Sequence, residues 1–355
     1  MSSVQYPSNT IFTSKTSIWA RRGWTFQEDL LSARQVIFTG EQVWWRCPCA
    51  TWCEASQLES IDSVRFLLDG HSVVPRLRER YSDLATNKYA ELVASYAQRT
   101  LSYPSDGLNA ISGVLSMLTQ YSGEEFLWGL MKSRFQSQLH WFGRATKRTL
   151  AQQRDLPTWS WVSWEGQTSF DHHLTYEPLM IYYSIKEDHE GQTCVRTCQS
   201  GDFSNEICEP ARKAMSVVRI EDVENESFAL HLKPDFHLLF YTCSATFHLT
   251  LQGRLTLPHL PVRYQHDARG TVVGPKPDYG YLIPSLEATE LSETGNRECI
   301  LLGRRPAKSV HDEVHVLVML IARDAMSIAH RLGIADMPEE FWDLAEKTRG
   351  LIALG

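Results

Sequence analysis

The chain has 355 residues, which is enough for two or three folding units of ordinary size. Hydrophobic residues make up 43% of the sequence and charged residues 22%, which is typical of a globular protein and not of a disordered chain. The formal net charge of -7 argues against nucleic acid or an anionic membrane as the partner, because both normally bind a basic face.

Tryptophan is unusually frequent, and its 11 residues are clustered along the chain. Such large rings predict well-packed cores or a recognition surface. The chain opens without a secretory apolar segment, and its longest apolar run, at 314–322, is too short to span a membrane. The eight cysteines are therefore interpreted as reduced thiols, and we expect a cytoplasmic protein.

The first elements are predicted within residues 17–60, after a polar segment at 1–16 that is expected to be frayed. Apolar residues at helical spacing predict a helix over 18–31 that ends at Ser32. The sequence QVIFTGEQVWWR at 35–46 then has two β-branched and aromatic runs around Gly40, which predicts a β-hairpin.

Residues 80–150 predict a small helical unit. A first helix carries an apolar face between Leu84 and Tyr96. Ser105 is a suitable N-cap for a second helix, which is expected to end near Ser122 and Gly123. Apolar residues between Phe126 and Leu139 predict a third helix.

The hydrophobic period changes to two over residues 156–325, which predicts an antiparallel β-rich sandwich or irregular barrel. Residues 186–212 are polar and are interpreted as an excursion from it. Residues 335–355 predict a C-terminal helix and tail, with Pro338 at the helix start and acids in the first turn. The predicted fold class is therefore α+β. The alternating runs lie at 159–164, 178–185, 215–220, 227–232, 236–250, 271–273, 280–283, 299–303 and 313–321.

Residues 20–47, ARRGWTFQEDLLSARQVIFTGEQVWWRC, resemble the closing segment of the fungal HET (heterokaryon incompatibility) domain. The segments YAQRTLSYPSDGLNAISGV at 96–114 and LPTWSWVSWEG at 156–166, and the later RLGI, are similar to regions that follow this domain. The first motif is matched by Arg22, Gly23, Trp24, Thr25, Gln27, Glu28, Leu30, Leu31, Ser32, Arg34, Trp45 and Cys47.

The resemblance implies a fungal self/non-self recognition protein that regulates programmed cell death through contacts with a protein partner. The family's domain begins with an α/β half that carries SYxWG-like and IDxxCINQ-like segments, and neither pattern occurs in this sequence. We therefore expect a truncated HET-domain tail at 17–60, followed by the downstream region. Two alternatives stay open: a TIR-like NAD-cleaving enzyme and an inactive truncated relative.

Glu28 is the candidate catalytic residue of the enzymatic alternative. A carboxylate beside Trp24 and Phe26 is expected to lose part of its hydration, which would suit general acid or base catalysis. The favoured interpretation is structural: Gln27 and Glu28 bond main-chain groups or pair with a nearby arginine such as Arg34.

The other motif residues are also interpreted as structural. Gly23 is expected to allow a tight entry to the helix, with Arg22 beside it as a weaker candidate for binding an anion. Ser105 and Asp106 are interpreted as a helix cap. The tryptophans of 156–166, Trp159 and Trp161 among them, are expected to join the sheet to the helical unit.

Neither a metal nor a cofactor is expected. Cys47, Cys49 and Cys53 form CPCATWC, but structural zinc sites usually have C-x2-C pairs, so the three are interpreted as packed or surface thiols. The HDEVH sequence at 311–315 lacks the order and the helical spacing of a metalloprotease site. The sequence also contains no phosphate-binding loop and no dinucleotide fingerprint.

Overall fold

The computed structural model confirms an α+β fold, with short helices and one large sheet. The chain divides into two compact units, residues 1–129 and 130–355. This boundary lies within the predicted helical unit at 80–150, so residues 130–142 group with the β-rich unit instead. The described residues are 17–38, 43–47, 50–54, 87–143, 145–147, 156–170, 176–187, 193–197, 232–233, 236–250, 254–257, 264–266, 272–275, 280–283, 294–306 and 313–355.

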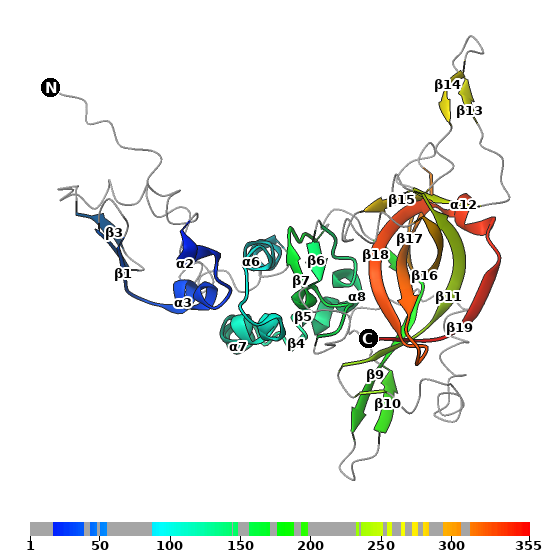
Figure 1. The fold of residues 1–355 in the computed structure, drawn as a ribbon. Helices are drawn as coiled ribbons and strands as arrows, with labels where there is room; N and C mark the ends of the chain where they lie inside the picture. Colours follow the sequence, from blue (N-terminus) through cyan, green and yellow to red (C-terminus); the bar gives the residue numbers. More distant parts are fainter. Residues whose placement is uncertain are drawn as a thin grey trace. The chain divides into compact units, whose positions relative to one another are not determined.

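The first unit contains short helices and a small sheet (Figure 1). The predicted hairpin is confirmed, because β1 and β2 pair antiparallel with Phe38 opposite Val43. A third strand, β3, pairs with β2 and was not predicted. The elements are α2 (Ile18–Arg21), α3 (Thr25–Leu31), β1 (Gln35–Phe38), β2 (Val43–Cys47), β3 (Ala50–Cys53), α6 (Asn87–Ala97), the 3-10 helix η2 (Pro104–Gly107), α7 (Asn109–Ser122) and β4 (Phe126–Leu127).

The core of the first unit forms where α3, α6 and α7 meet. Phe26 of α3 lies 5.5 Å from the ring of Tyr96 on α6, measured between ring centroids. Tyr96 also donates a hydrogen bond of 2.6 Å to the carbonyl oxygen of Gly107, which fixes the turn before α7. The side chains buried here include Tyr89, Leu92, Val93, Ala97, Ala110, Ile111, Val114, Leu115 and Leu118.

Two predictions in this part of the chain are wrong. Ser105 does not cap α7, because it lies inside the 3-10 helix η2 and the helix begins after Leu108 instead. The third helix between Phe126 and Leu139 is replaced by short elements, since Trp128 and Gly129 have φ angles of 49° and 78°. A right-handed helix cannot continue through two such residues. The end of α7 is confirmed at Gly123, where φ is 72°.

The second unit is built mainly from strands, as the alternating pattern predicted. Short helices precede the sheet and one interrupts its last strands. The elements are β5 (Leu130–Met131), η3 (Lys132–Arg134), α8 (Phe135–Gln138), β6 (Ala145–Lys147), η4 (Trp161–Ser163), β7 (Trp164–Gly166), β8 (Glu177–Pro178), β9 (Ile181–Glu187), β10 (Thr193–Thr197), β11 (Leu238–Leu249), β12 (Arg254–Thr256), β13 (Tyr264–His266), β14 (Val272–Pro275), β15 (Gly280–Ile283), β16 (Gly295–Arg305), β17 (His315–Arg323), β18 (Ala329–Pro338), α12 (Glu339–Asp343) and β19 (Lys347–Leu354).

The large sheet closes on itself into an irregular barrel (Figure 1). Antiparallel pairs join β11 to β16, β16 to β17 and β17 to β18, and β19 pairs with β11 over residues 347–354. The ring is completed between β18 and β19 by a single parallel pair, Ala329 with Leu354. Closure at this point therefore depends on very few backbone contacts.

Several expectations about the second unit are corrected by the structure. The predicted strand at 159–164 is mostly the 3-10 helix η4, and β7 starts only at Trp164. The predicted C-terminal helix at 335–355 is limited to the five residues of α12, which are followed by β19. The runs at 215–220 and 227–232 lie outside the described residues, as does most of the polar excursion.

One face of the curved sheet forms a single apolar core. Phe341 and Trp342 of α12 pack against Phe247 of β11, with ring centroids 5.5 and 5.7 Å apart. The short helix therefore fills part of the space that the strands enclose. The core residues are Ala245, Phe247, Leu249, Leu255, Cys299, Leu301, Val316, Val318, Leu320, Leu332, Ala335, Met337, Phe341, Trp342 and Ala345.

A buried arginine fastens the segment before β6 to the sheet. Arg331 of β18 is 0% exposed, and its guanidinium carbon lies 3.7 Å from the ring centroid of Trp141. Its guanidinium donates a hydrogen bond of 2.9 Å to the carbonyl oxygen of Leu139 and another to that of Trp141. Burial lowers the pKa of Arg331 well below its usual value. Stacking on Trp141 and the hydrogen bonds to the two carbonyl oxygens offset part of the free-energy cost of burying this charge.

No helix in the described part of the chain is both long enough and apolar enough to cross a membrane.

Replacing Arg331 by Lys should lower the free energy of unfolding by about 3 kcal/mol. The ammonium group keeps the charge but can neither fork to two carbonyls nor stack on Trp141 in the same way. Urea unfolding followed by tryptophan fluorescence measures the change. The exposed Arg134→Lys is the matched control and should change stability by less than about 0.5 kcal/mol. An equal effect of both substitutions would contradict the assigned role of Arg331.

The second unit should lose stability in acid because of His140. Burial, and then the charge of Arg331, lowers the pKa of His140 to about 3 from 6.5. Between pH 3 and pH 6.5 the unfolded chain therefore binds a proton at His140, whereas the folded chain does not. The contribution of His140 to the free energy of unfolding is fully present above pH 6.5 and is lost as the pH falls towards 3. The loss should reach about 2 to 4 kcal/mol.

His140→Phe tests this acid sensitivity, because it removes the titrating group and keeps a ring against Tyr176, whose centroid lies 5.2 Å away. Urea unfolding at a series of pH values should show a shallower decline for this variant. The partly exposed His248 provides the control, since His248→Phe should leave the slope unchanged. A variant that declines as steeply as the wild type would rule out His140 as the cause.

Candidate functional site

The sequence motif around Arg22 is held against residues 99–113 within the first unit. The amide of Gly23 donates to the carbonyl oxygen of Thr100, and the amide of Thr100 donates to that of Arg21, both at 2.7 Å. Trp24 donates a hydrogen bond of 3.1 Å from Nε1 to Oδ2 of Asp106. Two of the segments that carry the family resemblance are therefore joined by direct contacts.

The close approach of these two segments explains why position 23 is a glycine. A Cβ atom added to Gly23 would lie 2.9 Å from Cγ of Leu101 and closer still to its Cδ2. The backbone of Gly23 is not among those with positive φ, so the expected unusual conformation is not the reason for glycine here. Glycine is needed because a side chain would push the two segments apart.

Gln27 and Arg99 complete the junction. Oε1 of Gln27 accepts a hydrogen bond of 3.1 Å from the amide of Gly113 in α7. The guanidinium of Arg99 lies 4.8 Å from the ring centroid of Phe26, and its Nη1 donates to Oγ1 of Thr25 at 3.2 Å. Burial lowers the pKa of Arg99, although the charge of Asp29 opposes this change. These side chains position the segment against α7 and the residues that follow α6.

Glu28 differs from its neighbour Gln27. Its side chain is exposed, whereas the enzymatic alternative required a carboxylate partly shielded from water. Its main-chain oxygen accepts from the amide of Ser32 and from Nε2 of Gln35, both at 3.3 Å. Arg22 and Arg34 are also exposed. The motif therefore presents charged groups at the surface and keeps its apolar and amide side chains for packing.

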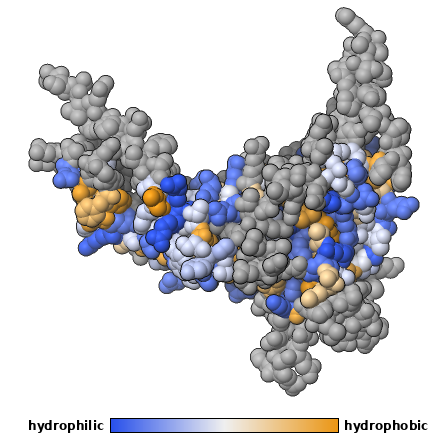
Figure 2. Space-filling model, in the orientation of Figure 1, coloured by the Kyte–Doolittle hydropathy of each residue, from blue (hydrophilic) through white to orange (hydrophobic). Residues whose placement is uncertain are grey.

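Large apolar side chains are exposed around the same motif, and we call them the exposed apolar set. Val36 and Trp45 are opposite one another on β1 and β2, and Phe38 follows on the same face of β1. Phe38 is 79% exposed. Figure 2 shows apolar side chains gathered over the part of the first unit that contains β1, with a smaller apolar spot near α2. The exposed apolar set comprises Ile18, Trp19, Trp24, Leu31, Val36, Phe38, Trp45 and Tyr103.

The cysteine cluster is only partly described. Cys47 is a half-buried free thiol at the end of β2, and Cys53 lies on β3. Cys49 lies outside the described residues, so the triplet as a whole is not placed. No group of three or more histidine, cysteine or acidic side chains suited to a metal ion occurs among the residues that the structure describes.

The tryptophans of 156–166 are enclosed in the second unit. Trp159 and Trp161 are 0% exposed, as are Trp141 and Trp164. Trp141 donates from Nε1 to the carbonyl oxygen of Trp159 at 2.9 Å, and Trp159 donates to that of Phe236 at 3.1 Å. The rings are buried, and the indole N–H groups of Trp141 and Trp159 bond main-chain oxygens within the unit. This run therefore offers no recognition surface.

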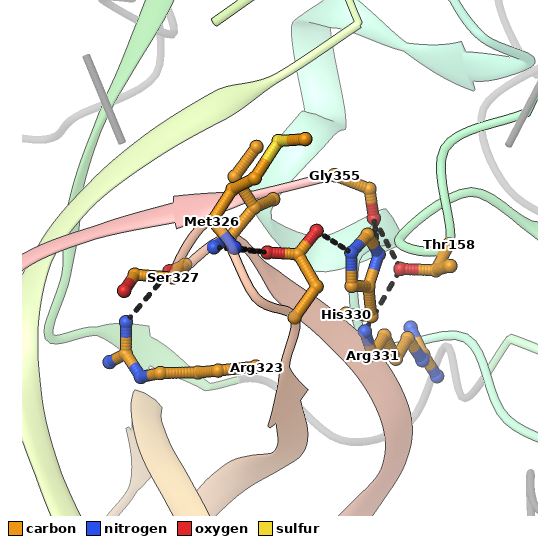
Figure 3. Close-up of polar contacts among 9 residues, drawn as sticks. Thr158, Arg323, Met326, Ser327, His330, Arg331 and Gly355 are labelled. Carbon is orange, nitrogen blue, oxygen red and sulfur yellow. Dashed lines mark hydrogen bonds and ion pairs between the residues drawn. The ribbon is translucent and has the colours of Figure 1, made fainter. Parts of the chain in front are cut away.

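A polar cluster in the second unit was not found from the sequence (Figure 3). Thr158 donates from its amide to the main-chain oxygen of Gly355 at 3.0 Å, and its hydroxyl donates to the same oxygen. The amide of Arg331 donates to Oγ1 of Thr158 at 2.9 Å. The segments 156–166 and RLGI, which also carry the resemblance, therefore meet at this cluster.

His330 and Asp324 extend this cluster. Nε2 of His330 lies 3.1 Å from Oδ2 of Asp324, and its Nδ1 lies 3.2 Å from the Gly355 oxygen. Asp324 begins the turn between β17 and β18, in which Ser327 has a φ of 62°. The available sequence signal was Asp-Ala-Met-Ser between two apolar runs, which is typical of a hairpin turn.

Comparison of the chain with protein-family models, curated proteins and solved structures gives no significant match. The resemblance to the HET family therefore rests on the sequence motifs and stays a prediction.

Gly23→Ala should weaken the junction between the motif and residues 99–113. Leu101 must move to admit the new methyl group, and such overpacking typically costs about 1 to 3 kcal/mol. Hydrogen exchange of the α3 amides in the full chain measures this loss. Gly350→Ala is the control, because a Cβ at that position meets no atom within 4 Å. Unchanged α3 protection in Gly23→Ala would show that the close approach does not matter.

Proposed function

We propose that this protein is a heterokaryon-incompatibility-like regulator of programmed cell death that acts in the cytoplasm through contact with a protein partner. The observation that carries the proposal is the exposed apolar set on the segment with the family-like motif. Val36, Phe38 and Trp45 form an apolar strand surface that water would disfavour. Aromatic side chains of this kind often dominate the binding energy of protein interfaces.

The hydrogen bonds of the motif residues support a role in contact with a partner more than a catalytic role. Trp24 and Gln27 of the motif segment bond residues 106 and 113, and Arg99 bonds Thr25, so these side chains are used within the junction. The junction thus fixes α3, and Gln35 at the start of the hairpin of β1 and β2 bonds the main-chain oxygen of Asp29 at the end of this helix. Such anchoring favours binding, because little conformational freedom is lost when the partner docks.

The enzymatic alternative, NAD cleavage by Glu28, gains no specific support from the geometry. The carboxylate is exposed, and among the described residues no side chains enclose it in the way that would exclude water and orient a nucleotide. This alternative and the inactive relative are therefore treated as outcomes of the test.

The test compares cell death in fungal hyphae that express the wild-type protein or the double variant Val36→Ser and Phe38→Ser. Uptake of a membrane-impermeant dye is counted after fusion with a genetically different strain. We expect death with the wild type and about a tenfold lower dye-positive fraction with the double variant, because truncating interface anchors typically costs about 2 kcal/mol or more. NAD is measured in the same cells.

Leu344→Ser is the matched control, because Leu344 is an exposed apolar residue of the second unit. It should leave the death response unchanged. A folded wild-type protein that causes no death would contradict the proposal and favour an inactive relative. Loss of NAD that Glu28→Ala prevents, without loss of folding, would instead establish the enzymatic alternative.

A further inference from the structure

Gly355, which follows β19, is held where the large sheet closes. Its amide donates to the carbonyl oxygen of Ala329 at 2.9 Å, next to the single register pair between β18 and β19. Its main-chain oxygen accepts from Thr158 and contacts His330 (Figure 3). On one side β19 is paired with β11 up to Leu354, whereas on the β18 side its end is fixed by the Gly355 amide, by Thr158 and by the His330 side chain.

His330 is placed as a doubly protonated ring. Both of its nitrogens lie near acceptors, Oδ2 of Asp324 at 3.1 Å and the Gly355 oxygen at 3.2 Å. Oδ1 of Asp324 already accepts from the amides of Met326 and Ile328, both at 2.9 Å, which is the pattern of an ionised carboxylate. A neutral imidazole has only one N–H group, so only the imidazolium form can donate to both partners.

His237, which also lies beside Gly355, is placed as a neutral ring. Its Nδ1 accepts a hydrogen bond of 2.6 Å from the amide of Lys233, so this nitrogen carries no proton. The ring lies against Gly355, because a Cβ atom added there would come within 2.8 Å of Cδ2 of His237. Burial, followed by the charges of Lys233 and His330, lowers the pKa of His237 to about 4.

Nearby charged groups act on both members of this histidine pair. Asp324, from the turn before β18, attracts the charge on His330 and, more weakly, favours a charge on His237, whereas Lys233, which precedes β11, repels a charge on His237. The guanidinium of Arg323 is directed to Glu298, and that of Arg331 to the carbonyl oxygens of Leu139 and Trp141.

We propose that His330 and His237 form a two-sided pH latch on the end of β19, which closes only when His330 is protonated and His237 is neutral. Raising the pH removes a proton from His330 and with it one of the two hydrogen bonds. Lowering the pH charges His237, breaks its bond to Lys233 and places a second cation beside His330. In either direction the end of β19 separates from β18 while the rest of the sheet persists.

Hydrogen exchange in the full chain tests the latch. Protection of the Gly355 amide, which bonds Ala329 of β18, should be greatest near pH 6 once it is corrected for the intrinsic pH dependence. It should fall about tenfold by about pH 9 and again by about pH 3, because a hydrogen bond to a charged group is worth roughly this factor or more. The amides of β17 serve as the internal reference for unfolding of the whole unit.

Matched variants separate the two sides of the latch. His330→Gln should remove the alkaline decline, and His237→Gln should remove the acid decline, while His248→Gln should keep both. Ring nitrogen chemical shifts at pH 6 should report an imidazolium at His330 and a neutral ring at His237. A flat wild-type profile, a neutral His330 ring, or both declines surviving in both variants would overturn the proposal.

Discussion

The second unit depends on hydrogen bonds from three consecutive residues of β18 to other parts of the chain. Ala329 accepts from Gly355, His330 contacts Asp324 and Gly355, and Arg331 bonds Thr158 through its amide. The Arg331 side chain adds the carbonyls of Leu139 and Trp141. Burying a guanidinium is costly, so the alignment of these acceptors decides whether the tryptophan-rich segment can lie against the sheet.

Local patterns predicted those elements whose partners are close in sequence. The hairpin of β1 and β2 and much of β11 follow from alternating apolar residues, whereas β16 and β17 contain consecutive apolar residues that are buried one after another. The C-terminal part was predicted wrongly because the helix signals after Pro338 are satisfied within the five residues of α12. The strand β19 owes its conformation to pairing with β11, about a hundred residues earlier in the sequence. No local propensity carries that information.

In the candidate site, too, the sequence pattern does not show which single residues make the long-range contacts. The sequence drew attention to Glu28 because it is an ionisable group among aromatic residues, yet the neighbouring Gln27 makes the contact with α7 and Glu28 is exposed. His330 and Asp324 carried no motif that would single them out. Their importance arises only when the turn after β17 brings them to Gly355.

The motif segments thus pair within each unit: residues 22–27 with 99–113, and 156–166 with RLGI. In the second unit this pairing encloses the tryptophans completely, and only Met326 and Leu344 are exposed large apolar residues among those described there. In the first unit the pairing leaves Trp19, Trp24 and the strand residue Phe38 at the surface. The same kind of junction therefore completes a core in one unit and supports an apolar surface in the other. This difference is why we propose partner contact for the first unit and a conformational role for the second.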